Sequence, residues 1–335
     1  MIIFPGQGYF DLELLKKKYV KDFCYEYGLK DIFETVSQDT KNMFYAKYAQ
    51  VIIVATEVAQ YLEYSNKYKE NNNILVGYSL GEISSLIAAE VLDIKEGIEF
   101  VKERAKLSDE FYKEHLKERY FVGKVPYEEN IEKELKENDF KIINFVPDFN
   151  STKTSIVIIG KDKEQIFDFM KQKRRGEPLE DLHMSELLCP FHTELMMELK
   201  EKQKQAFEEK VHKFKAQNLE KVFCTRIASK YNKDMSKEEI NNSLAEYLVT
   251  PIQTKKTLEY FENIGLKQED IIVTMGKIFI NDYLKEQCEI VGLNGNIIDM
   301  DNLIYKEWFY ESYFKTRYKR CWKKRPSYKR SRWIC

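Results

Sequence analysis

Short runs of consecutive apolar residues alternate along the chain with longer stretches in which apolar residues recur every three or four positions. The short runs, which are typical of buried strands, occupy residues 2–4, 74–77, 222–224, 271–274 and 296–298. The longer stretches predict amphipathic helices, and the clearest cover residues 43–64, 94–118, 237–248 and 251–264. Strands that alternate with helices favour an α/β fold with an open, mainly parallel sheet and helices on both faces.

A different pattern occupies the middle of the chain. Strands are predicted over residues 120–125, 141–145, 154–160 and 184–188, with helices over 128–138 and 163–173. This order, strand–helix–strand–strand–helix–strand, is that of a ferredoxin-like unit. We therefore predict a small ferredoxin-like subdomain of residues 119–188, inserted into a large α/β subdomain of residues 1–118 and 189–305.

Charge is distributed unevenly. The 335 residues carry a formal net charge of -1, yet ten lysines and arginines and no acid lie between Ser312 and Cys335. The rest of the chain therefore carries about -11. We treat residues 306–335 as a basic C-terminal tail.

The cysteines and the apolar segments indicate where the protein works. The six cysteines form no C-x-x-C pair and have no histidine nearby at metal-ligand spacing, so we expect reduced thiols and no metal site. The N-terminus lacks a basic region and reaches Pro5 too soon for a signal peptide. The longest apolar run, residues 51–55, is too short to span a membrane. We expect a cytoplasmic protein without a membrane partner.

Residues 77–81 read Gly-Tyr-Ser-Leu-Gly, a G-x-S-x-G motif between an apolar strand and an amphipathic run. In a strand–turn–helix of this kind, glycines permit a sharp turn that exposes the hydroxyl of Ser79 at its apex. The N–H of Leu80, at the start of the helix, would then point toward a developing oxyanion. The alternative is a glycine-bounded turn in which the serine only caps the helix.

A nucleophilic serine needs a base, and the chain has four histidines. His115 and His212 lie in charged helical runs typical of solvated side chains, and His183 lies in a polar segment. His192 alone lies in an apolar turn before a predicted helix, which suits either a base or a buried structural histidine. No acidic motif stands ready to orient it, so a backbone carbonyl is the remaining candidate.

Two further features are ambiguous when taken alone. Residues 4–8, Phe-Pro-Gly-Gln-Gly, form either a loop with exposed backbone N–H groups or a plain strand-to-helix turn. Arg104 lies on a predicted helix next to an apolar position, where a single arginine is usually solvated.

Taken in order, residues 4–8, residues 77–82, Arg104 and residues 190–193 resemble the signature of malonyl-CoA:acyl carrier protein transacylases. The acyltransferase domains of polyketide synthases share this signature. The 25-residue interval from Ser79 to Arg104 also fits the family, and the resemblance covers about residues 1–300. It implies an α/β-hydrolase-like large subdomain.

The resemblance also implies a reaction. Ser79 would attack the thioester of malonyl-CoA while His192 takes its proton, with the backbone N–H groups of Gln7 and Leu80 holding the oxyanion. The malonyl group would then pass to the phosphopantetheine thiol of an acyl carrier protein, in fatty acid or polyketide biosynthesis. No bound cofactor is implied, and the family is typically monomeric.

Four residues around this chemistry carry further expectations. Arg104 is similar to the family's arginine that pairs with the malonyl carboxylate, and the backbone carbonyl of Tyr247 would orient His192. Phe191 is similar to the residue of malonyl-preferring members. Tyr78 stands where the family usually has histidine, so we expect one wall of the pocket to be altered, which leaves the range of acyl groups open.

Other functions remain to be weighed against transfer. An acyl hydrolase would use the same Ser79 and His192 to clear acyl groups from carrier proteins, but such relatives tend to lose the arginine. An inactive carrier-binding module would not need an intact site. The tail is either a solvated extension or a surface that steers acidic carrier proteins. It has no fold signal for nucleic acid, so we expect no nucleic-acid partner.

Overall fold

We describe the fold from a computed structural model. The structure describes residues 1–7, 12–68, 74–116, 119–147, 154–174, 185–187, 189–264, 271–275 and 296–299. The chain divides into a compact unit, Met1–Met300, and a segment, Asp301–Cys335. The predicted tail and His183 lie outside the described residues, so the predictions made for them stay predictions.

Ten α-helices and ten strands fall within the described residues. The helices are α1 (Lys18–Glu26), α2 (Lys30–Gln38), α3 (Ala46–Tyr68), α4 (Gly81–Ala88), α5 (Ile94–Phe111), α6 (Ile131–Glu137), α7 (Lys163–Lys173), α8 (Met197–Lys210), α9 (Lys237–Glu246) and α10 (Thr254–Asn263). The strands are β1 (Ile2–Phe4), β2 (Leu75–Gly77), β3 (Tyr120–Pro126), β4 (Lys141–Pro147), β5 (Thr154–Gly160), β6 (Ser185–Leu187), β7 (Val222–Cys224), β8 (Ser229–Lys230), β9 (Ile271–Thr274) and β10 (Asn296–Asp299).

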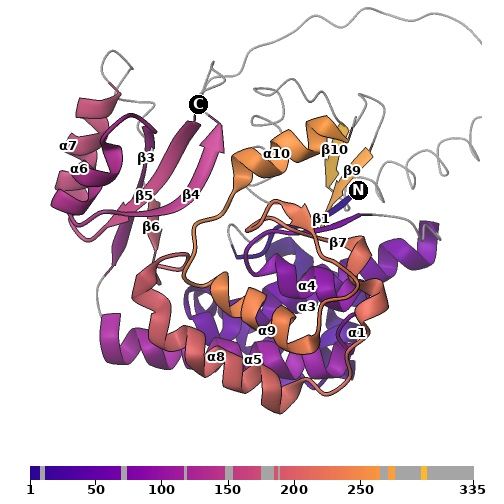
Figure 1. Cartoon of the computed structure of the whole chain (residues 1–335). Helices are drawn as coiled ribbons and strands as arrows, with labels where there is room; N and C mark the ends of the chain where they lie inside the picture. The colour runs from indigo at the N-terminus through magenta and orange to yellow at the C-terminus, as the bar shows by residue number, and fades with distance from the viewer. Residues whose placement is uncertain are drawn as a thin grey trace, which may run out of the picture. The chain divides into compact units, whose positions relative to one another are not determined.

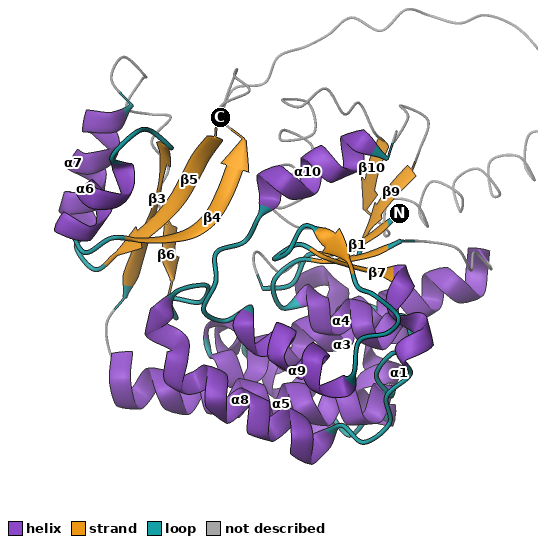
Figure 2. Ribbon diagram, in the orientation of Figure 1, coloured by secondary structure: helices purple, strands orange, loops and turns teal. Residues whose placement is uncertain are grey.

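The larger sheet has six strands in the order β10-β9-β1-β2-β7-β8. All neighbours pair in parallel except β7 and β8, which form an antiparallel pair. Helix α10 lies on one face of this sheet, and α4 and α3 lie on the other (Figure 2). Because both faces are covered, the central strands are continuously apolar, as the sequence predicts for a parallel sheet.

The α10 face shows how the register builds the core. Ile3 lies opposite Val76, and Val76 lies opposite Phe223, so three side chains form one row across the sheet. Leu258 and Phe261 of α10 pack on this row. Each buried side chain of this kind stabilises the folded protein by about 1.5–3 kcal/mol. This packing fixes α10 over the strands that carry the site.

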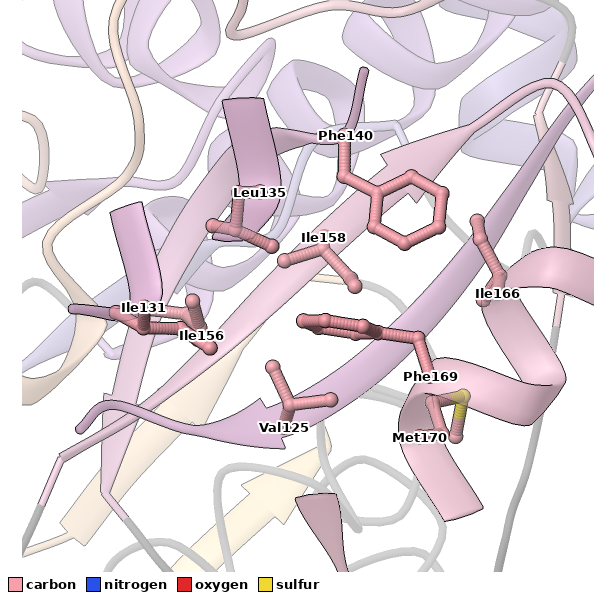
Figure 3. Packing of buried hydrophobic residues seen from close by; sticks show 9 residues of the cluster. All are labelled: Val125, Ile131, Leu135, Phe140, Ile156, Ile158, Ile166, Phe169 and Met170. Atoms are coloured by element: carbon pink, nitrogen blue, oxygen red, sulfur yellow. The ribbon is translucent and has the colours of Figure 1, made fainter. Parts of the chain in front are cut away.

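The smaller sheet has four antiparallel strands in the order β4-β5-β3-β6. Its elements follow one another as strand–helix–strand–strand–helix–strand, the order expected from the sequence. Helices α6 and α7 lie on the same side of the sheet (Figure 1). Figure 3 shows their apolar side chains against the strands, and the core consists of Val125, Ile131, Leu135, Phe140, Ile156, Ile158, Ile166, Phe169 and Met170.

Several predicted bounds need correction, each for a local reason. Helix α5 ends at Phe111, seven residues early, and a π-helical segment, Tyr112–Leu116, follows it. Helix α6 begins at Ile131 because the preceding Asn130 has a left-handed φ of 68°. Strand β8 is only two residues long and was not predicted.

The start of α10 is the most informative of these differences. The sequence predicts a helix from residue 251, but α10 begins at Thr254. The N–H of Ile252 donates to Ile143 O at 3.0 Å, and the N–H of Phe145 donates to Ile252 O at 2.9 Å. Residue 252 therefore pairs with β4 as a parallel β-bridge and does not start the helix.

Candidate active site

The G-x-S-x-G motif folds into the predicted sharp turn. Strand β2 ends at Gly77, α4 begins at Gly81, and Ser79 between them has a φ of 55°. A left-handed backbone at a non-glycine residue costs about 1–3 kcal/mol, so the surrounding structure must hold it. A Cβ on Gly81 would lie 1.9 Å from the carbonyl oxygen of Phe4, so only glycine lets the end of β1 approach the turn.

Ser79 and His192 form a hydrogen-bonded pair. The Oγ atom of Ser79 lies 2.8 Å from Nε2 of His192, and Nδ1 of His192 lies 2.7 Å from the carbonyl oxygen of Tyr247. A carbonyl oxygen can only accept, so the proton of the neutral ring resides on Nδ1. Nε2 is then the acceptor for the hydroxyl proton of Ser79, as a general base requires.

The surroundings of His192 keep it neutral. The residue is buried, has a φ of 70°, and its N–H donates to Leu248 O at 2.7 Å. Burial lowers the pKa of His192 to about 4, with a further lowering from the charge of Arg104, while the hydrogen bond to Tyr247 opposes the shift. The imidazole is therefore available as a base at neutral pH.

The two residues predicted to form an oxyanion hole, Gln7 and Leu80, lie beside the loop after β1 and the sharp turn. Gly6 has a φ of 73°, and a Cβ there would lie 2.8 Å from the Leu80 nitrogen, so the loop after β1 packs directly on the turn. Gln7 and Leu80 both line the cavity that contains Ser79 and His192. Within the described part of the chain, neither N–H donates a hydrogen bond.

The loop after β1 is anchored from α3. The N–H of Gly6 donates to Oε1 of Glu57 at 2.6 Å, and the hydroxyl of Ser84 in α4 bonds the other carboxyl oxygen at 2.5 Å. Glu57 is buried and makes no ion pair with a described Lys or Arg. Burial therefore raises its pKa to about 8, with both hydrogen bonds opposing the shift.

Arg104 is buried in the same cavity, although a single arginine at such a helix position is usually solvated. Only 7% of the residue is exposed. Its Nε–H donates to Oε1 of Gln203 at 2.8 Å, its Nη1 donates to Oε1 of Gln50, and its guanidinium carbon lies 5.6 Å from the centre of the Phe191 ring. Burial lowers the pKa of Arg104 to about 10, so the guanidinium stays charged at neutral pH.

Of the predicted site residues, all but Tyr78 line one cavity. Its lining residues are Gln7, Ser79, Leu80, Glu82, Ile83, Arg104, Phe191, His192, Gln203, Leu244, Tyr247 and Leu248. We correct the placement of Tyr78 as a wall of this pocket. Its phenol bonds Thr254 and accepts from Nδ2 of Asn144 at 2.8 Å, so the side chain extends toward β4 and α10.

Sequence reasoning missed two features of the site. One is the pair of glutamines that bind Arg104, and the other is the buried carboxyl group of Glu57. In α3, Gln50 comes directly before an apolar run and Glu57 interrupts it, which is a weak signal for buried polar groups. Gln203 lies in a Lys- and Glu-rich helix and carries no such signal.

A second cavity of about 360 Å³ lies where α5 ends near the smaller sheet. It is lined by Phe111, His115, Tyr120, Asp139, Lys141, Ile159, Gly160, Lys161, Leu195 and Glu198. None of the described residues that line it is a serine or a cysteine, whereas Ser79 lies beside His192 in the first cavity. Over the described ranges, no cluster of three or more metal-binding side chains occurs. None of the helices in those ranges is long and apolar enough to cross a membrane.

Comparisons with known proteins show what the chain resembles as a whole. No family model matches the chain. The malonyl CoA-acyl carrier protein transacylase of Bacillus subtilis is 24% identical over 287 residues, which cover 82% of this chain and 68% of the relative.

The solved structures show the same fold. The malonyl-CoA:acyl carrier protein transacylase of Helicobacter pylori superposes with a TM-score of 0.70 at 17% identity, covering 95% of this chain and 98% of that chain. The corresponding protein of Xanthomonas oryzae pv. oryzae gives a TM-score of 0.69 at 19% identity, covering 93% and 97%. The resemblance first seen in four short motifs thus extends over most of the chain, which is similar in sequence and fold to malonyl CoA-acyl carrier protein transacylases.

Proposed function

We propose that this protein transfers a malonyl group from malonyl-CoA, through an acyl-enzyme on Ser79, to the phosphopantetheine thiol of an acyl carrier protein. The observation that carries the proposal is a hydrogen-bonded Ser79–His192 pair in one cavity with a buried, charged Arg104. The names of the relatives support the same substrates. The pathway in which the product is used, fatty acid or polyketide synthesis, is outside this proposal.

In the first half-reaction, Ser79 Oγ attacks the thioester carbonyl and its proton passes to Nε2 of His192. General-base assistance of this kind contributes about 10²–10⁴-fold. The carbonyl oxygen becomes an oxyanion, which the N–H groups of Gln7 and Leu80 hold, and loss of one such donor typically costs about 10²–10³-fold. When the intermediate collapses, the C–S bond breaks and the proton on His192 passes to the leaving thiolate of coenzyme A.

The second half-reaction runs the same steps with another thiol. The phosphopantetheine thiol gives its proton to His192 and attacks the seryl ester, and the proton then returns to Ser79 Oγ as the C–O bond breaks. Atoms and charges balance without a bound cofactor, so the thioester is the only activated group that the cycle needs.

Arg104 explains why the acyl group should carry a charge. A planar guanidinium binds a carboxylate through two parallel hydrogen bonds, and among the described residues Arg104 has no acidic partner. A buried cation without an anion favours a substrate that supplies one. Malonyl-CoA meets this requirement and acetyl-CoA does not.

The finer structural assignments belong to the same proposal. We describe the larger sheet with its helices as α/β-hydrolase-like and residues 119–188 as ferredoxin-like, which the strand order and directions of the smaller sheet support. A cytoplasmic, monomeric enzyme remains our expectation.

Intact mass spectrometry tests the proposal. We expect malonyl-CoA to add a malonyl group to the wild-type chain and to leave Ser79→Ala unmodified. The adduct should move to a phosphopantetheinylated carrier protein when that carrier is added. Arg104→Ala should lose the preference for malonyl-CoA over acetyl-CoA while keeping its Ser79–His192 pair. Free malonate released without a carrier, at the rate at which thioester is consumed, would identify a hydrolase and refute transfer.

A further inference from the structure

Tyr247 touches both members of the catalytic pair. Its carbonyl oxygen accepts from Nδ1 of His192 at 2.7 Å, and its ring meets the imidazole edge to face, with centroids 5.2 Å apart and planes at 74°. Its phenol oxygen accepts the backbone N–H of Ser79 at 2.9 Å. Sequence analysis predicts only the first of these contacts.

The direction of each hydrogen bond around the phenol can be deduced. The hydroxyl of Thr225 donates to the carbonyl oxygen of Gly77 at 3.0 Å, which uses its only proton. The phenol of Tyr247 also bonds Thr225 Oγ1, so the phenol must be the donor there. Its oxygen is then free to accept from Ser79, and the order is Ser79 N–H to Tyr247 O–H to Thr225 O–H to Gly77 C=O.

This relay bridges two backbone groups of the same sharp turn. Gly77 and Ser79 are two residues apart, and the relay leaves neither the carbonyl of one nor the N–H of the other without a partner. Tyr247 is 5% exposed, and burial raises the pKa of its phenol well above the usual value, so the phenol keeps the proton that the relay needs. The strained φ of Ser79 is thus held by side chains from outside the turn.

We propose that the phenol of Tyr247, acting with Thr225, is a positioning group that fixes the Ser79 nucleophile relative to the His192 base. The inference rests on the proposed function, because it concerns the acylation of Ser79. One residue sets the place of the base through its carbonyl and the place of the nucleophile through its ring. Since the ring has only two side-chain torsions and is packed on the imidazole, little freedom remains between the two reacting atoms.

The first test is Tyr247→Phe, which removes the phenol oxygen but keeps the ring and the carbonyl. The Ser79 N–H then loses its acceptor in a partly buried site. We expect the single-turnover rate of acylation by malonyl-CoA, followed by quenched mass spectrometry, to fall about 10- to 100-fold. The concentration of malonyl-CoA at half-maximal rate should not change, because the hydrogen bonds of the phenol are already made with Ser79 and Thr225. The pH midpoint of the rate should also stay, because the carbonyl still orients His192.

Thr225 provides a second pair of variants. Thr225→Val removes the hydroxyl that accepts from the phenol and should slow acylation in the same way. Thr225→Ser keeps the hydroxyl and should restore the rate. Because both positions belong to one relay, the double variant Tyr247→Phe/Thr225→Val should be slowed by less than the product of the two single effects.

Tyr231→Phe is the matched control. Its phenol is also buried and bonds Glu82 and Ser243, but it contacts neither Ser79 nor His192. We expect it to lower the melting temperature and to leave the acylation rate within about twofold, since no group of the relay is lost.

Three results overturn the inference. If the adduct forms as fast on Tyr247→Phe as on the wild type, the positioning role is refuted and the proposed function is unaffected. Equal slowing in Tyr231→Phe and Tyr247→Phe means that loss of stability alone accounts for the rate. If the wild-type chain forms no adduct, the proposed function and the inference are both refuted. If Tyr247→Phe fails to fold, as judged by circular dichroism, the Thr225 variants decide in the same way.

Discussion

The buried carboxyl group of Glu57 should make the stability of this protein fall as pH rises, and Glu57→Gln should remove the part of that dependence that Glu57 contributes. The pKa of Glu57 is raised from 4.5 to about 8 because the folded protein buries the group without a cation. The folded chain therefore binds the Glu57 proton more tightly than the unfolded chain does. The stability that this contributes is fully present below pH 4.5 and is lost as pH rises toward 8.

The size of the effect follows from the shift. Each pH unit between the two pKa values changes the free energy of unfolding by about 1.4 kcal/mol, so the change from pH 5 to pH 8 is about 4 kcal/mol. Glutamine has nearly the same shape and its carbonyl oxygen can still accept from Gly6, but it does not titrate. Its amide can donate to the hydroxyl of Ser84, which then serves as the acceptor.

Urea unfolding at pH 5, 6.5 and 8, with wild type and Glu57→Gln side by side, measures this difference. The wild type should lose about 4 kcal/mol relative to the variant across the range, and the variant should be the more stable of the two at pH 8. Other titrating groups, such as Glu82, affect both proteins and cancel in the difference. A difference that stays constant within about 1 kcal/mol would show that Glu57 is not neutralised by burial, and the reasoning would fail.

Two further predictions concern residues with a proposed role in the reaction. The pKa of His192 is lowered to about 4, and a general base works only when neutral, so the acylation rate should stay level from pH 8 down to about 5 and fall with a midpoint near 4. A midpoint near the ordinary histidine value of 6.5 in single-turnover experiments would contradict the burial argument. Gln203→Glu should place a carboxylate against Nε of Arg104 and compete with the malonyl carboxylate, so malonyl adduct formation should fall about tenfold or more while acetyl adduct formation does not. Gln203→Leu, which only removes the acceptor, should lower malonyl acylation less, and the ratio of the two adducts by mass spectrometry distinguishes the cases.

The features that could be predicted from the sequence are those that neighbouring residues determine. The glycines around Ser79 and the apolar strand before them specify the sharp turn locally, and the alternation of strands and helices specifies the α/β fold. The pairing of Ser79 with His192 could be predicted because His192 is the one histidine of the four that lies in an apolar turn. Its geometry depends on Tyr247, whose carbonyl the family resemblance indicated.

What could not be predicted depends on residues far apart in the chain. Arg104 looked solvated because its two acceptors, Gln50 and Gln203, lie 54 and 99 residues away. Residue 252 was expected to be helical because its pairing with β4 is a tertiary contact that local propensity does not register. The relay joins Ser79, Thr225 and Tyr247, which lie in three separate segments of the chain. No local sequence pattern could therefore predict it.

The contacts between β4 and the rest of the site have a mechanical consequence. Residue 252 shares two hydrogen bonds with the backbone of β4, and Asn144 of that strand bonds both Tyr78, next to the nucleophile, and Thr254 at the start of α10. A hinge motion that swung the smaller sheet away from Ser79 would have to break all of these bonds at once. In the proposed reaction, the acyl group and the carrier thiol should therefore enter and leave a rigid frame, and turnover should not wait for the sheets to open and close.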